Sequence, residues 1–149
     1  MNSQDDVEYR IKLADGFFKE AKEDINIKRW RSCVANSQLV VENAGKAILM
    51  LFGISPKTHE PAKHLDKLIR DVKIPSDIKD KLKKIMPEFV ALGVEEHFMT
   101  DYGEESSYIL PWDIFDEDSA RNALKAAKQC KQAAEQIVKH VQSQRAKLL

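Results

Sequence analysis

The sequence predicts an all-α protein, an up-and-down bundle of about five helices with a long loop before the last helix. Apolar residues recur at alternating steps of four and three residues through several long segments, which is the spacing of one helix face. Gly and Pro fall mainly between those segments, and no segment is a convincing strand. At 149 residues the chain can bury a continuous core without disulfides or metals, so we expect one helical domain over residues 1–149.

The first two helices are expected to form an antiparallel hairpin. The first runs over about residues 6–24, and only the very short break at residues 26–27 separates it from the second, over about residues 28–52. Gly53 stands where a C-terminal cap belongs. Gly45 costs about 1 kcal/mol relative to Ala inside a helix, and tight packing against a neighbour is the natural compensation.

Proline residues divide the middle of the chain. Pro61 suits the first turn of a third helix that ends near Asp71, and a fourth helix begins at Pro75-Ser76. Pro87 lies within the fourth apolar repeat and removes an amide donor, so we expect a kink or a split there.

The segment from Thr100 to Phe115 is predicted to be the long loop, because it is rich in turn formers and aromatic residues. Loops of this length in compact domains are often functional. Asp116 then caps a last helix with an acidic first turn and an alanine-rich apolar seam. Whether that seam packs within one chain or between two is open.

Composition limits the classes of function. Lys and Arg number 24, as do Asp and Glu, so no net charge attracts nucleic acid broadly, and we expect no DNA partner. No apolar run approaches the ~20 residues that cross a bilayer, and the polar, acidic N-terminus is unlike a signal peptide. Cys33 and Cys130 lie in apolar stripes and are interpreted as buried free thiols. We therefore expect a cytoplasmic protein without membrane contact.

Three cations cluster at the N-terminus of the second helix. Lys28, Arg29 and Arg31, together with free backbone amides and the helix dipole, would make an anion site. Charged helix ends are more often simply solvated, and both interpretations stay open.

Four further residues complete the set of candidate ligand-binding residues. Lys46 lies one turn after Glu42. The two residues are either a functional pair or an ion pair that simply stabilises the helix. His64, near the start of the third helix, either touches a phosphate or packs and caps. Tyr102 and Tyr108, with Trp112 and Phe115 of the same aromatic loop, either stack on a base or enter a dimer interface.

No metal site or cofactor is expected. His59 and His64 are five residues apart across Pro61 and would not share one helix face neatly. The chain contains neither a Gly-rich phosphate loop nor a Ser/His/Asp or Cys/His arrangement at a recognisable spacing.

Two strings flank the Gly/Pro break after the second helix. The first is Val41–Ala47, with Glu42 and Lys46 one turn apart, and the second is Lys63–Leu68, which contains His64-Leu65. With the aromatic loop and the acidic start of the last helix, their order and spacing resemble the HEPN family (higher eukaryotes and prokaryotes nucleotide-binding) over roughly residues 5–145. The resemblance implies a helical bundle that begins with a hairpin.

One departure from the family concerns catalysis. Nuclease members carry an Arg followed by four to six residues and then His, near their last helices. After Arg121 those positions hold Ala126, Ala127 and Lys128, and no other Arg has His at that spacing. RNA cleavage without a metal needs one group to take the 2′-hydroxyl proton and another to stabilise the phosphate charge. We therefore expect no catalysis.

The resemblance implies a non-catalytic module that forms a homodimer and binds a nucleotide-type ligand or a partner protein. The partner implied is a small nucleotidyltransferase, of the kind often paired with HEPN domains, in a toxin–antitoxin setting. The alternative is a divergent HEPN ribonuclease or toxin with a site around Arg121, His97 and Tyr102. A third interpretation is a purely structural interaction module, which predicts no nucleotide binding.

Overall fold

The structure is a computed structural model that describes residues 3–148, with the backbone alone for residues 3 and 94–97. Within this part of the chain the regular elements are helical, which confirms the all-α prediction. The α-helices are α1 (Ser3–Asn26), α2 (Trp30–Leu51), α3 (Ala62–Arg70), α4 (Ser76–Ala91), α5 (Val94–Tyr102), α6 (Pro111–Ile114) and α7 (Glu117–Lys147), with a 3₁₀ turn, η1 (Glu105–Ser107), before α6.

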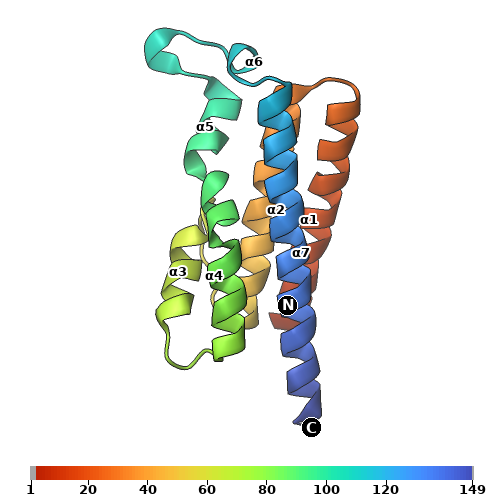
Figure 1. Cartoon of the computed structure of the whole chain (residues 1–149), viewed down its shortest axis with the longest axis vertical. Helices are drawn as coiled ribbons and strands as arrows, with labels where there is room; N and C mark the ends of the chain where they lie inside the picture. Colours follow the sequence, from red (N-terminus) through yellow and green to blue (C-terminus); the bar gives the residue numbers. More distant parts are fainter. Residues whose placement is uncertain (1–2, 149) are drawn as a thin grey trace.

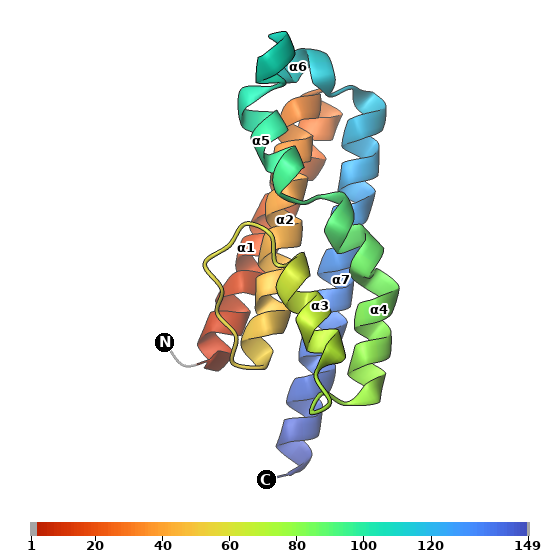
Figure 2. The same cartoon turned by 90° about the vertical axis from the view of Figure 1, so that its left-hand side faces the viewer.

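The central element of the bundle is α2. It forms the predicted antiparallel hairpin with α1, and α7 runs along the length of both (Figure 1). The shorter helices α3, α4 and α5 cover its remaining side (Figure 2). Every residue from Val40 to Leu51 is consequently buried, including the polar ones, which is the pattern of a helix enclosed on all sides.

The alanine-rich seam of α7 packs within the chain. Its buried residues include Ala120, Ala127, Ala134 and Ile137, and α2 is the helix that α7 contacts most. Asp116 caps α7 as predicted, because its Oδ1 atom accepts a 2.9 Å hydrogen bond from the amide of Ser119.

Gly45 is placed where the chain returns along α2. The segment over residues 52–61 turns back beside the end of α2 and leads into α3 (Figure 2). A Cβ atom on Gly45 would lie 2.5 Å from Cγ of Pro61 and 3.3 Å from Cε1 of Phe89. This close contact supplies the packing expected to compensate for glycine inside a helix.

Two expectations in the middle of the chain need correction. Of the two alternatives expected at Pro87, a kink or a split, the split does not occur, because α4 continues through this exposed residue to Ala91. The helix is instead interrupted before α5, at Leu92-Gly93. The predicted loop is also shorter than expected: Thr100 belongs to α5, and the segment after it contains η1 and α6. Within the described residues, no helix is both long enough and apolar enough to span a membrane.

Candidate functional site

The connection between α1 and α2 presents two cations at one end of the bundle. The amide of Arg29 donates to Asp24 O (2.9 Å) and that of Lys28 to Ile25 O (3.2 Å), the hydrogen bonds of a Schellman turn. Lys28 occupies the position in this turn that glycine usually takes, with φ of 61°. A left-handed conformation costs a residue with a side chain about 1–2 kcal/mol. Both side chains are exposed.

Arg31, in the first turn of α2, joins this end of α2 to the α5–α6 region. Its Nη1 atom donates a 2.8 Å hydrogen bond to the carbonyl of Thr100, and its guanidinium lies 5.9 Å from the ring centroid of Trp112 on α6. Its Nε atom is buried without a hydrogen-bond partner. Arg31 thus has a structural role and still carries one unsatisfied donor.

These three cations line one cavity, together with aromatic side chains from two elements. The cavity has a volume of about 420 Å³, and we call it the cationic cavity; its lining residues are Lys28, Arg29, Trp30, Arg31, Ser32, Trp112 and Phe115. It opens at the N-terminus of α2, where no side chain caps the free amides. Free amides, cations and indole rings are the groups that bind a phosphate and a flat ring together.

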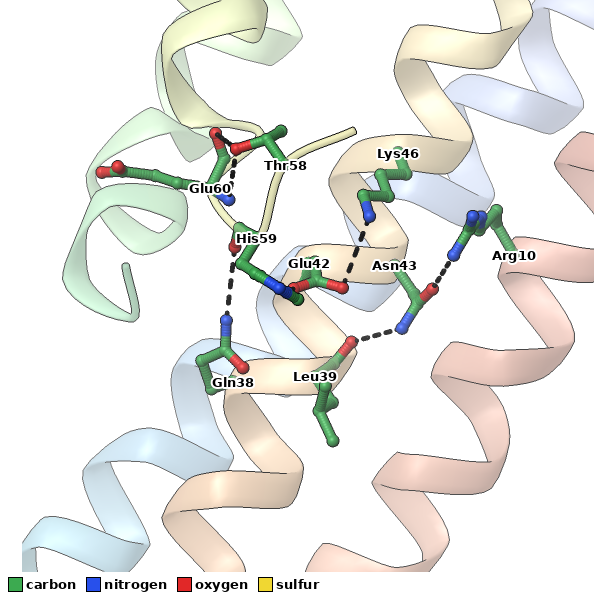
Figure 3. A network of polar contacts seen from close by, with 9 residues as sticks. All are labelled: Arg10, Gln38, Leu39, Glu42, Asn43, Lys46, Thr58, His59 and Glu60. Atoms are coloured by element: carbon green, nitrogen blue, oxygen red, sulfur yellow. Dashed lines mark hydrogen bonds and ion pairs between the residues drawn. The ribbon is translucent and has the colours of Figure 1, made fainter. Parts of the chain in front are cut away.

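Lys46 is not part of this cavity. It lies in the C-terminal half of α2 with its side chain 10% exposed, and its Nζ atom is 3.5 Å from Oε2 of Glu42. The other carboxylate oxygen of Glu42 lies 2.8 Å from Nδ1 of His59, on the segment that returns along α2 (Figure 3). The pair is therefore a buried structural ion pair and differs from the exposed i,i+4 pair of an ordinary helix surface.

Further polar contacts surround this pair. Asn43, on the next face of α2, accepts a 2.9 Å hydrogen bond from Nη1 of Arg10 on α1 and donates one to the carbonyl of Leu39 (Figure 3). Gln38 donates to the carbonyl of His59 at 3.4 Å. The network holds α1, α2 and the return segment together, as buried polar groups require.

The other candidates are also separated from the cationic cavity. His64 is half-buried on α3, which lies toward the opposite end of the bundle (Figure 1). Tyr102 and Tyr108 are exposed near η1, and Tyr102 lines a different hollow of about 290 Å³ together with Glu104 and Glu105. The structure thus brings together three of the seven predicted site residues.

Trp30 and Trp112 supply the indole rings of the cationic cavity. Sequence reasoning did not select Trp30, and it considered Trp112 only as an aromatic residue of the predicted loop, without connecting it to the three cations. Trp30 could have been found from its position in the sequence, because it stands between Arg29 and Arg31 of the cationic cluster. Trp112 lies about 80 residues away from that cluster in the sequence, and only its contact with Arg31 brings it there.

The residues of the alternative nuclease site are only partly described. Arg121 is exposed in the first turns of α7 and pairs with Glu117 at 3.3 Å. The side chain of His97 lies outside the described residues. At the positions where nuclease members carry His, Ala126 and Ala127 are buried and Lys128 is exposed.

Neither cysteine is in a reactive setting. Both are buried free thiols, and burial raises the pKa of Cys33 to about 11 and raises that of Cys130 further. Among the described residues, no three His, Cys, Asp or Glu side chains gather as metal ligands would.

Comparison with known proteins gives three similarities. The family model described as "HEPN domain" matches residues 7–141. A protein of Methanocaldococcus jannaschii with the name "Putative toxin MJ1304" is 29% identical over 140 residues, which cover 89% of this chain and 91% of that one. The crystal structure of TT1696 from Thermus thermophilus superposes with a TM-score of 0.65 at 17% identity, covering 92% of this chain and 99% of that chain. At that identity the last similarity concerns the fold alone.

Proposed function

The chain belongs to the HEPN domain family, and from that premise we propose that it is a non-catalytic member that binds a nucleotide-type ligand in the cationic cavity. The observation that supports this most is the convergence of Lys28, Arg29 and Arg31 on one cavity that two indole rings also line. The cations and free amides would hold the phosphates, and an indole ring would stack on the base.

Two details of the cavity support an anionic ligand. Lys28 is kept at a position where glycine would be less strained, so the turn holds a cation at a conformational cost. The Nε atom of Arg31 has no partner within the described residues; because this atom is buried, a phosphate oxygen would satisfy it only after a shift of the side chain toward the cavity.

The proposed setting is a cytoplasmic homodimer that acts with a small nucleotidyltransferase. The family resemblance supports this arrangement, in which the HEPN protein would present a substrate to the transferase or regulate it. Bound nucleotide would then be the chemical link between the two proteins. His64, Lys46 and the two tyrosines lie outside the cavity, so we do not assign them to the phosphate contacts.

A second candidate function is that of a divergent ribonuclease toxin. The similarity to the M. jannaschii protein, whose name includes the word toxin, favours it. In this case Arg121 would stabilise the phosphate charge, and its exchange for Ala in a folded protein would abolish cleavage of RNA. Absence of cleavage by the wild-type protein would remove this candidate.

The experiment that tests the main proposal is calorimetric titration with nucleoside triphosphates. Arg29 is the residue to change, because its side chain is exposed. Arg31 is less suitable, because its hydrogen bond to Thr100 also links α2 to α5. Loss of binding in Arg29→Ala, with unchanged thermal unfolding, would support the cationic cavity as the site.

A further inference from the structure

A surface next to the cationic cavity carries a concentration of exposed apolar side chains. Six of the eleven large apolar side chains that are exposed in the described part of the chain lie within residues 98–112. Five of them form what we call the cap: Phe98, Tyr102, Tyr108, Ile109 and Leu110. Figures 1 and 2 show this region projecting at one end of the bundle. Exposed apolar groups concentrated in this way mark interaction surfaces.

The backbone holds the cap in a fixed shape. Glu104 and Ile109 exchange two hydrogen bonds, of 2.8 Å and 2.9 Å, across the η1 turn. Tyr108 is held in the left-handed region with φ of 58° while its side chain is 93% exposed. Gly103, also at positive φ, allows the carbonyl of Ile109 to approach where a Cβ atom would lie 2.1 Å away. A preorganised turn that presents an aromatic side chain to solvent lowers the entropic cost of binding.

The charged residues of the sequence segment that contains the cap are all acidic. Residues 85–120 contain ten Asp or Glu residues and neither Lys nor Arg, whereas the rest of the chain has 24 Lys or Arg against 14 Asp or Glu. Among the described side chains, Asp101, Glu105 and Asp113 are exposed beside the apolar residues of the cap. The neutral total therefore hides a strong separation of charge along the chain.

From the combination of exposed apolar anchors and acidic surroundings we infer that the cap is the docking surface for a basic partner protein. The partner surface would offer an apolar pocket surrounded by Lys and Arg side chains. Aromatic anchors inserted in such a pocket would supply most of the affinity, and the charges would supply orientation and association rate.

The same charges argue against the other occupants. Nucleic acid would be repelled by the carboxylates. Two copies that met cap to cap would bring like charges together. A cap that met the basic remainder of a second copy would make a head-to-tail contact, which extends into chains unless the rotation closes a ring. A different, basic protein is therefore the occupant that the cap favours.

This inference rests on the partner-binding part of the proposed function and is independent of the cationic cavity. The probe is a fluorescein-labelled amphipathic helical peptide with leucines on one face and arginines on either side of it. Its binding is followed by fluorescence anisotropy at low and moderate salt. A peptide with Glu in place of every Arg is the charge control.

We expect saturable binding of the basic peptide and none of the acidic one. Tyr108→Ser/Leu110→Ser and Glu105→Gln/Asp113→Asn should each weaken it on the order of tenfold. The matched control, Glu20→Gln/Glu23→Gln, neutralises exposed acids on α1 and should bind as the wild type does. Circular dichroism verifies folding of each variant.

Three results would overturn the inference. The first is that the basic peptide does not bind, and the second is that the cap variants and the α1 variant lose peptide binding equally. The third is that the cap variants dissociate a homodimer in sedimentation, because the cap would then be a contact between two copies of the chain. Nucleotide titration of the same proteins separates this inference from the proposed cavity. Failure of nucleotide binding with retained peptide binding would refute the cavity alone.

Discussion

The ring of Pro61 occupies the space that a side chain on Gly45 would need, because a Cβ atom there would lie 2.5 Å from Pro61 Cγ. Gly45 is on the central helix and Pro61 ends the segment that returns along it. The contact therefore sets how closely this segment and α3 approach α2. It also turns a residue that is unfavourable in an isolated helix into one that the tertiary structure requires.

Exchange of Gly45 for Ala should destabilise the protein although Ala is the better helix former. Displacement of Pro61 and Phe89 should cost about 1–3 kcal/mol of the free energy of unfolding, as measured by urea denaturation. Gly16→Ala is the control, because Gly16 is exposed within α1 and nothing lies within 4 Å of its Cβ position. That change should stabilise by about 0.5–1 kcal/mol. A stabilising Gly45→Ala would refute the packing account.

The buried pair of Glu42 and Lys46 should respond as a unit. Glu42→Met leaves the ammonium of Lys46 buried without its carboxylate, and we expect a loss of about 3–5 kcal/mol. Glu42→Met/Lys46→Met removes both charges and should cost clearly less than the two single changes added together. Denaturant unfolding of the four proteins measures this coupling. Additive effects would mean that the two charges are independent.

Lys28 offers a substitution in which stability and binding move in opposite directions. Lys28→Gly relieves the left-handed strain, so the free energy of unfolding should rise by up to about 1 kcal/mol. The same change removes a cation from the cationic cavity and should weaken nucleotide binding. Thermal unfolding and calorimetry on one preparation check both effects. Unchanged affinity would exclude Lys28 from the phosphate contacts.

Asp77 at the start of α4 gives a prediction for acid unfolding. Its Oδ2 atom lies 2.7 Å from Nε2 of His140 on α7, and this hydrogen bond lowers the pKa of Asp77 below its ordinary 3.8. A carboxyl group with a lowered pKa stabilises the folded state fully above its unfolded value, and the contribution is lost as the pH falls through the folded value.

The Asp77→Asn variant should therefore melt below the wild type at mildly acidic pH, and the difference should shrink once the pH falls below 3.8. Melting curves recorded between about pH 6 and pH 2 cover this window. Asp80→Asn, an exposed neighbour on α4, is the control. A difference between wild type and Asp77→Asn that is the same at every pH would contradict the account.

The elements that local chemistry defines were predictable from the sequence. The cap by Asp116 depends on residues within a single turn, and Gly53 has the positive φ of a helix C-terminal residue. Where tertiary contacts decide, local reasoning failed. The split considered at Pro87 does not occur, and the helix is interrupted instead at Gly93, next to the carboxylate of Glu60.

The candidate site divides in the same way. Lys28, Arg29 and Arg31 are neighbours in sequence, so their cluster was visible as a pattern. Burial of Lys46 depends on segments that fold over α2 from elsewhere in the chain, and a helical period carries no information about them. The excess of acidic residues over residues 85–120 is visible in the sequence. It was not recognised because only the net charge of the whole chain, which is zero, was considered.

The most direct test of the central claim is titration of the wild-type protein with ATP, GTP, CTP and UTP by calorimetry, at low and moderate salt. If the cationic cavity is the site, binding is saturable and is weakened by salt. Arg29→Ala should abolish it. Lys63→Ala, which removes an exposed cation on α3, should leave it intact. Absence of heat with every nucleotide would contradict the claim, as would equal loss of binding in the two variants.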